Sequence, residues 1–418
     1  MSRQQTANPL WTKDFTIITL GSAVSMVGNA MCGFALSLLV LDYTKSTFLY
    51  AIYLTAYTLP QIIVPVFSGA VLDRFSRKKT IYTLDFISAV LYAFAAYVLH
   101  LEWFNFPILA VFCFIVGTIN SIYTVAYQSF YPLLITEGNY SKAYSISSFL
   151  ETVSMIMIPV ATFAYNMLGM TPLFALNAVS FLCAAIMETQ IGAKEDYVEL
   201  QQQNRIVSGS FKNQLFADLK EGLEYLKQEK GLQAVTYYFT IASVAYGVSS
   251  VITLPYFKET YPNGEYVYII VWGMSVLGRG LGSLIHYKFK YPAKHKYNIA
   301  IVVYVITALA EGIYLYLNVP VMMAVFFVVG ILGVTSYTIR ISATQNYVPD
   351  EKKGRFNGAF NMLNTGGHLL GELVAGILTI KFAPRTVLTG FMMMSALFAV
   401  IIIGGNKKAV SNVYNREL

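Results

Sequence analysis

The chain has 418 residues, of which 56% are hydrophobic and 12% are charged, and its mean hydropathy is +0.55. A water-soluble core cannot bury so much apolar surface, so we expect most of it to face lipid. The net charge of +7 therefore indicates how the chain is oriented in a membrane and not nucleic-acid binding, because surplus Lys and Arg mark the cytoplasmic loops of membrane proteins.

Twelve apolar segments of about 20 residues, the length that crosses a bilayer, follow one another along the chain. We expect them near residues 15–40, 49–69, 80–99, 107–131, 143–168, 172–190, 234–257, 266–287, 297–317, 321–345, 356–380 and 385–404. With these spans, 23 of the 29 Lys and Arg fall on one side of the membrane and only Lys45, Lys258, Lys381 and Arg385 fall on the other. The positive-inside rule predicts that both termini are cytoplasmic.

A short charged turn joins the second and third segments. Residues 69–79 read Gly-Ala-Val-Leu-Asp-Arg-Phe-Ser-Arg-Lys-Lys. This turn resembles the signature Gly-x-Leu-small-Asp-Arg-x-Gly-Arg-Lys, which members of the major facilitator superfamily carry between their second and third membrane helices. The matching residues are Gly69, Asp73, Arg74, Arg77 and Lys78, whereas Val71, Leu72 and Ser76 depart from the pattern.

The resemblance implies an all-α membrane protein with twelve transmembrane helices in two pseudo-symmetric six-helix bundles. It also implies that the turn is a gate, in which Asp73 pairs with cations and helix ends and holds the outward-open state. The alternative is that the cations only set the orientation of the chain. Asp85 lies about five residues into the third segment, and we expect it to brace the cations of the turn.

The longest interruption between apolar segments runs from residue 191 to residue 231. Apolar residues recur in it at spacings of three and four, which is typical of an amphipathic helix; they are Phe211, Leu215, Leu219, Leu223 and Leu226. We predict an N-terminal six-helix bundle over residues 1–190, a cytoplasmic linker with this helix over 191–233, and a C-terminal six-helix bundle with a short cytoplasmic tail over 234–418. The alternative for the amphipathic helix is that it binds a soluble partner.

Ionisable residues inside apolar segments are expensive and often functional. His368 and Glu372 are four residues apart and share a helix face, and the glycines around them permit close helix approach. A proton can pass between such groups, because His titrates near physiological pH. We predict Glu372, then Glu151, as proton-coupling carboxylates, with His368 and Glu311 as further candidates. The alternatives are that the pair on the shared face only stabilises helix contacts and that Glu311 faces water.

Other polar and aromatic residues are candidates for lining a substrate cavity. Arg279 and Arg340 stay charged, so each extends into water at the membrane interface or faces the cavity, where it favours an anionic or zwitterionic substrate. Most aromatic side chains are expected to pack or to lie at the interface. Six tyrosines are candidates for contact with a flat amphipathic molecule: Tyr53, Tyr57, Tyr123, Tyr127, Tyr237 and Tyr238.

Several motifs together resemble the macrolide-efflux branch of drug:proton antiporters. They are the charged turn followed by Asp85, the Tyr131-Pro-Leu-Leu-Ile turn, residues 221–232, and Pro349 through Gly354-Arg355. The resemblance implies export of an amphipathic organic compound in exchange for protons. An exporter of an anionic or zwitterionic metabolite such as a siderophore is the alternative, and a non-transporting membrane receptor or scaffold is the alternative from a different class.

An enzyme is not expected. The sequence lacks the Gly-x-x-x-x-Gly-Lys-Ser/Thr loop that binds ATP, and His100, His286, His295 and His368 have no metal-ligand spacing. We therefore expect no cofactor and no metal. The expected partners are a small-molecule substrate, protons and the lipid bilayer, with no nucleic acid, and the chain is expected to be a monomer in a bacterial inner membrane.

Overall fold

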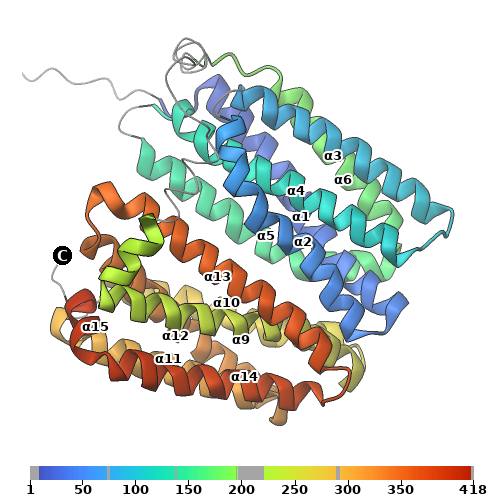
Figure 1. The fold of residues 1–418 in the computed structure, drawn as a ribbon. Coiled ribbons are helices and arrows are strands. Elements are labelled where there is room, and N and C mark those ends of the chain that lie inside the picture. The colour runs from blue at the N-terminus through green and yellow to red at the C-terminus, as the bar shows by residue number, and fades with distance from the viewer. Residues whose placement is uncertain are drawn as a thin grey trace, which may run out of the picture. The chain divides into compact units, whose positions relative to one another are not determined.

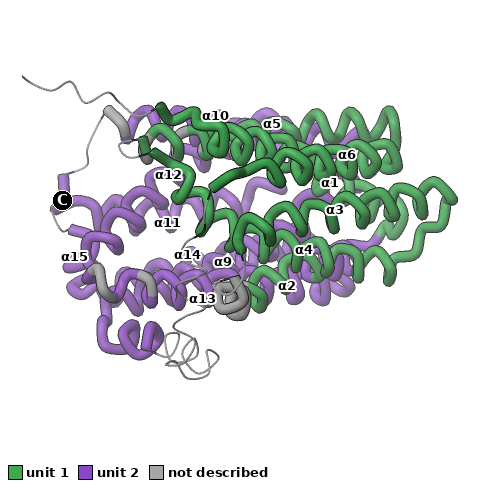
Figure 2. The backbone as a smooth tube through the Cα atoms, turned by 90° about the horizontal axis from the view of Figure 1, so that it is seen from above, with its two compact units in different colours: residues 1–45, 56–211 green, residues 46–55, 212–418 purple. Residues whose placement is uncertain are grey.

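The computed structural model describes residues 9–72, 76–136, 139–193, 195, 221–288 and 292–415. These residues form helices and connecting turns, and no β-strand occurs among them (Figure 1). The chain divides into two compact units. Unit 1 comprises residues 1–45 and 56–211, and unit 2 comprises residues 46–55 and 212–418 (Figure 2).

Six long helices precede the central gap in the described residues and six follow it. The first six are α1 (Lys13–Thr44), α2 (Thr47–Leu72), α3 (Arg77–His100), α4 (Phe106–Phe130), α5 (Tyr140–Leu168) and α6 (Met170–Glu188). The second six are α9 (Lys230–Thr260), α10 (Gly264–Lys288), α11 (Lys296–Ile313), α12 (Val319–Tyr347), α13 (Asp350–Leu378) and α14 (Pro384–Phe398). A π-helix over Ala399–Gly404 extends α14, and a short helix, α15 (Lys407–Tyr414), follows it.

The twelve long helices occur in the order and at the places that the apolar segments predict. Within the described residues, ten of them are long and apolar enough to cross a membrane; α5 and α13 are comparably long. The predicted all-α membrane fold is confirmed. The helices begin a few residues before the predicted segments, and a polar side chain caps the start of α1, α3, α4 and α12. For example, the Thr12 hydroxyl accepts a hydrogen bond from the Phe15 N–H and caps α1.

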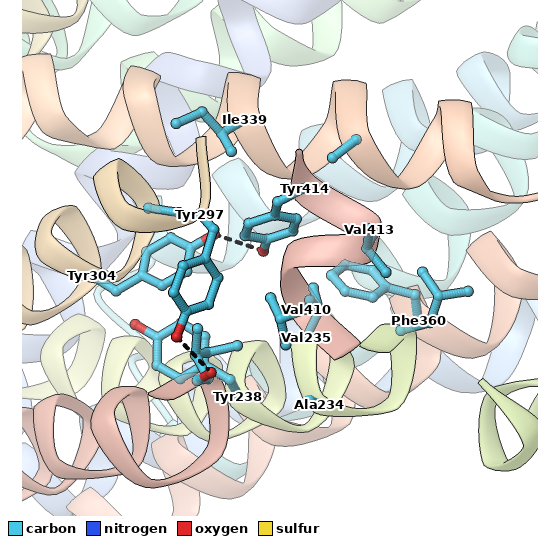
Figure 3. Close-up of a cluster of buried hydrophobic side chains, with 14 of the residues drawn as sticks. Ala234, Val235, Tyr238, Tyr297, Tyr304, Ile339, Phe360, Val410, Val413 and Tyr414 are labelled. Carbon is cyan, nitrogen blue, oxygen red and sulfur yellow. Dashed lines mark hydrogen bonds between the residues drawn. The ribbon is translucent and has the colours of Figure 1, made fainter. Parts of the chain in front are cut away.

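The core of unit 2 includes parts of the predicted linker and tail. Residues 221–228 are helical, and Tyr225 and Leu226 are buried in the same cluster as Val410, Val413 and Tyr414 of α15. The Tyr414 and Tyr304 hydroxyls lie 2.8 Å apart and share a hydrogen bond (Figure 3). The end of the described chain is therefore packed into unit 2. Phe211, Leu215 and Leu219 lie outside the described residues.

Helices α9 and α13 cross at very short range because glycines face the partner backbone. A Cβ atom added to Gly371 would lie 2.1 Å from the Val244 carbonyl oxygen, and one added to Gly247 would lie 2.0 Å from the His368 carbonyl oxygen. Only hydrogen fits in these positions. The close approach that the sequence predicts around His368 and Glu372 is thus present, and it places the backbone of Glu372 next to Gly247 of α9.

Candidate functional site

The charged turn before α3 is only partly described. Asp73 and Arg74 lie outside the described residues, and Gly69 belongs to the end of α2, where the description is limited to the helical backbone. The Arg77 guanidinium donates to the Ser129 carbonyl over 3.1 Å, and the Lys78 ammonium donates to the Ile191 carbonyl over 3.1 Å. These two cations therefore anchor the start of α3 within unit 1.

A carboxylate that the sequence reasoning did not select completes this anchor. Glu195 accepts hydrogen bonds from the backbone N–H of Arg77 over 2.8 Å and of Lys78 over 3.3 Å, and from the Ser76 hydroxyl. Because the first N–H groups of a helix have no intrahelical partner, an acidic side chain stabilises this end of α3. The predicted gating role of the turn stays a prediction.

The contact of Asp85 within the described residues differs from the one that we expected. Its side chain is 1% exposed and lies within hydrogen-bonding reach of the Glu188 carboxyl group at the end of α6. The helix geometry explains the difference, because Asp85 is about two turns beyond Arg77 on α3 and faces α6. The predicted role of Asp85 beside the cations of the turn, of which Arg74 lies outside the described residues, stays a prediction.

Unit 1 contains a cavity of about 610 Å³ whose lining includes many polar residues. The polar residues around it come from four helices and include Ser22, Asn29, Asp85, Asn120, Tyr123 and Tyr127. The Tyr123 hydroxyl lies 3.4 Å from the Ser22 hydroxyl, and the rings of Tyr123 and Tyr127 are stacked with their centroids 6.0 Å apart. Two of the six tyrosine candidates thus line this cavity.

The other tyrosine candidates have different surroundings. Tyr238 lines a cavity in unit 2, whereas Tyr237 is exposed. Tyr57 accepts a hydrogen bond from the Asn120 amide over 3.4 Å, next to the unit 1 cavity. Tyr53 is buried with its ring 5.7 Å from that of Tyr50, which is a packing role.

Besides Tyr238, the cavity of about 560 Å³ in unit 2 brings four predicted ionisable residues together. They are Arg279 of α10, Glu311 of α11, Arg340 of α12 and His368 of α13. Aromatic side chains fill much of the remaining wall, among them Tyr238, Tyr246, Trp272, Tyr304 and Tyr337. Charges of both signs between aromatic walls can bind a molecule that combines apolar rings with polar groups.

Arg340 lies among aromatic rings within this unit. Its guanidinium carbon is 4.8 Å from the ring centroid of Phe360, 5.0 Å from that of Phe239 and 5.6 Å from that of Tyr337. These are cation–π distances. Arg340 therefore lies among these rings while it lines the cavity of unit 2. Arg279 is exposed and lines the same cavity.

The predicted His368–Glu372 pair is present on α13. The His368 Nε2 atom and the Glu372 Oε1 atom are 3.5 Å apart, and the Glu372 side chain is 3% exposed whereas the His368 side chain is 35% exposed. His368 reaches the cavity of unit 2, and Glu372 lies behind it. The Glu151 side chain lies outside the described residues, so its predicted role stays a prediction.

Glu188 is the functional candidate that the sequence reasoning missed. It lies at the C-terminal end of α6, where a carboxyl group usually reaches water, and we did not count it among the intramembrane ionisable residues. The helical spacing carried a signal. The buried residues Asn177, Phe181 and Ala184 recur at intervals of four and three, and the same face continues to Glu188.

Comparisons with known proteins agree with this fold. The sequence model of the Major Facilitator Superfamily matches residues 18–372. The chain is 26% identical over 291 residues to the uncharacterized MFS-type transporter YkuC of Bacillus subtilis (strain 168) and 26% identical over 283 residues to macrolide efflux protein A of Streptococcus pyogenes. Each alignment covers 66% of this chain and 66% of the relative, so the chain spans just under two thirds of those relatives.

The nucleoside transporter NupG has a similar fold. Its crystal structure superposes on this chain with a TM-score of 0.63 and 15% identity, covering 94% of this chain and 98% of NupG. The family match and the apolar helices make the chain a multi-pass membrane protein. It belongs to the Major Facilitator Superfamily of transporters and is not an enzyme.

Proposed function

We propose that this transporter exports an amphipathic organic compound in exchange for protons, by alternating access between inward-open and outward-open states. The observation that carries the proposal is the cavity of unit 2, where aromatic walls surround Arg279, Glu311, Arg340 and His368. Such a lining suits a molecule with apolar rings and a few polar groups. The likeness to macrolide efflux protein A supports a large amphipathic cargo.

Proton coupling is assigned to the carboxyl groups within the helices. In unit 2 these are Glu372, which contacts His368, and Glu311, which lines the cavity; Glu151 of α5 stays a further candidate. Protonation of such a group changes the balance between the two states, and this couples proton movement to substrate movement. The turn with Asp73 and Arg74 would act as the gate.

The proposed setting follows from the loop charges and the relatives. We place the protein as a monomer in a bacterial inner membrane with both termini in the cytoplasm. The predicted bundles over residues 1–190 and 234–418, with the linker over 191–233, are part of the same proposal.

A second substrate class is favoured by one observation. Arg279 and Arg340 both line the unit 2 cavity and are always charged. A carboxylate-bearing substrate, such as an anionic or zwitterionic chelator, would pair with either guanidinium. Cargo of this class would make the protein a metabolite exporter.

Purified protein in proteoliposomes tests the proposed function. We would measure accumulation of radiolabelled erythromycin, ethidium and citrate under an imposed pH gradient that corresponds to protons entering the cell. Accelerated movement of erythromycin or ethidium, lost when the gradient is collapsed, is the expected result. Movement of citrate alone would favour the second class, and no accelerated movement of any of the three would overturn export and favour a receptor or scaffold.

Substitution of Arg340 is expected to weaken substrate binding. A hydrogen bond between a charged side chain and a polar group of a bound molecule contributes about 2 kcal/mol, which corresponds to roughly thirtyfold in affinity. If the Arg340 guanidinium binds the substrate in the cavity, Arg340→Gln should raise the half-saturating concentration of the transported compound by roughly that factor. Arg340→Lys keeps the charge but loses the planar group, so its effect should be smaller.

The chain offers a matched control for this substitution. The guanidinium of Arg385 lies 5.1 Å from the ring centroid of Tyr316, but Arg385 is outside the cavity lining. Arg385→Gln removes the same kind of contact and should leave the half-saturating concentration unchanged. Equal effects of the two Gln variants would show that Arg340 acts through general stability and not through the cavity.

A further inference from the structure

Two acidic side chains of unit 1 lie close together in the buried interior of the unit, where charged groups are unfavourable. Asp85 of α3 is 1% exposed and Glu188 of α6 is fully buried, and their carboxyl groups lie within hydrogen-bonding reach of each other. Three of their four carboxyl oxygens, namely Oδ2 of Asp85 and both oxygens of Glu188, are buried without a hydrogen-bond donor. Among the residues that the structure describes, no Lys or Arg pairs with either group.

This arrangement is unfavourable if both groups are ionised. Two adjacent negative charges repel, and burying each of them without a cation or donors costs several hydrogen bonds to water. A single proton removes one charge and turns one carboxyl group into an O–H donor for the other. The contact between the two side chains becomes a hydrogen bond only in that state.

The pair has a route to water on one side only. Asp85 lines the 610 Å³ cavity of unit 1, whereas Glu188 does not. Glu188 instead lies against α1, where a Cβ atom added to Gly21 would be 3.2 Å from its Oε1 atom. The titratable groups that face the pair from the neighbouring helices are the phenols of Tyr123 and Tyr127 on α4, and Ser22 of α1 and Ser147 of α5 also line the cavity.

A proton fits this site better than a metal ion. Hard cations such as Ca²⁺ and Mg²⁺ take six or more oxygen ligands, and no cluster of three or more His, Cys, Asp or Glu occurs in the described part of the chain. Glu188 is also closed off from the cavity, which a hydrated metal ion would need to enter. A proton can instead pass from cavity water to Asp85 and on to Glu188 through their contact.

From this geometry we infer that Asp85 and Glu188 form a carboxyl dyad that holds one exchangeable proton, which enters and leaves through the unit 1 cavity. Unit 1 then carries a proton while the cavity of unit 2 binds substrate. The transport consequence rests on the proposed function: release of the proton leaves two charges at the junction of α1, α3 and α6, which changes the preferred state of the transporter. The existence of the dyad does not depend on the substrate.

Infrared difference spectroscopy tests the dyad directly. The full-length protein in proteoliposomes is titrated with pH, and the C=O stretch of protonated carboxyl groups is recorded in H₂O and D₂O. The unmodified protein should show a deuterium-sensitive component that is absent from the double variant Asp85→Asn/Glu188→Gln. The component should persist in Glu102→Gln, which changes an exposed acid in the turn after α3. A double variant with the spectrum of the unmodified protein would overturn the dyad.

A second variant tests the assignment even if the double variant misfolds. Gly21→Ala keeps both carboxyl groups but brings a methyl group 3.2 Å from Glu188 Oε1, so it should change the pH at which the same component titrates. Gly33→Ala is its control, because an added Cβ there meets nothing within 4 Å. Identical titrations for the unmodified protein and Gly21→Ala would contradict the assignment to Glu188.

Transport measurements test the coupling separately. Asp85→Asn and Glu188→Gln should each lose the acceleration of erythromycin transport by a pH gradient, a loss of about 5–150-fold as for typical coupled sites. Both should retain erythromycin counterflow at equal pH. Gradient acceleration that persists in both variants would overturn the coupling role. If the unmodified protein moves no compound, the proposed function fails while the infrared result still decides the dyad.

Discussion

Glu372→Gln is expected to remove most of the acceleration of transport by a pH gradient. The loss should be about 5–150-fold, the usual range for coupling between two sites, because Gln has the shape of Glu but its amide does not ionise. Glu372 is buried 3.5 Å from His368, which reaches the unit 2 cavity. A change of charge at Glu372 therefore alters the electrostatic potential in the cavity, because the imidazole ring of His368 connects the two.

The measurement compares gradient-driven uptake with counterflow at equal pH in proteoliposomes. Glu259→Gln is the control, since Glu259 is an exposed acid in the last turn of α9 and should behave like the unmodified protein. His368→Asn removes the imidazole ring but keeps a polar group, so we expect gradient-driven transport to fall in this variant as well. Full gradient dependence in Glu372→Gln would show that the pair only stabilises the contact between α13 and α9.

The fold could be predicted from the sequence because the bilayer imposes a length on every apolar segment. The segments near 80–99 and 107–131 correspond closely to α3 and α4, at Arg77–His100 and Phe106–Phe130. The end turns could not be located in the same way. Polar residues such as Thr12 and Ser76 cap α1 and α3, and a hydropathy window does not distinguish a capping side chain from a loop.

The candidate site was less predictable because it depends on which helix faces meet. Arg279, Glu311, Arg340 and His368 stand out in the sequence as polar residues in apolar segments, but they lie on four different helices. Their spacing in the chain carries no information on a shared cavity. The structure supplies that placement, while their roles in transport stay predictions.

Asp85 and Glu188 also show that the sequence does not reveal which helix faces meet. The cations closest to Asp85 in sequence suggested an ion pair, yet its contact is a carboxyl group about a hundred residues away along the chain. Helices α3 and α6 pack side by side in unit 1 and bring the two acids together. Sequence reasoning assumes that a buried charge finds an opposite charge, and a functional site is where that assumption fails.

Gly371→Ala is expected to lower the stability of unit 2 although alanine favours helices. Replacing a glycine in the middle of a helix by alanine gains roughly 0.5–1 kcal/mol. Against this, the new methyl group would lie 2.1 Å from the Val244 carbonyl oxygen and 2.9 Å from its carbon, and overpacking of this kind costs about 1–3 kcal/mol. The steric term is the larger, so the variant should unfold at a lower temperature.

Gly366→Ala isolates the steric term on the same helix. An added Cβ there meets nothing within 4 Å, so only the gain in helix propensity remains and the unfolding temperature, followed by intrinsic fluorescence in detergent, should stay constant or rise. Gly371→Ala should also reduce gradient-driven transport, because any separation of α13 from α9 moves the adjacent Glu372. If both alanine variants unfold at the same temperature, the close crossing of α9 and α13 does not limit the stability of unit 2, and the steric argument is wrong.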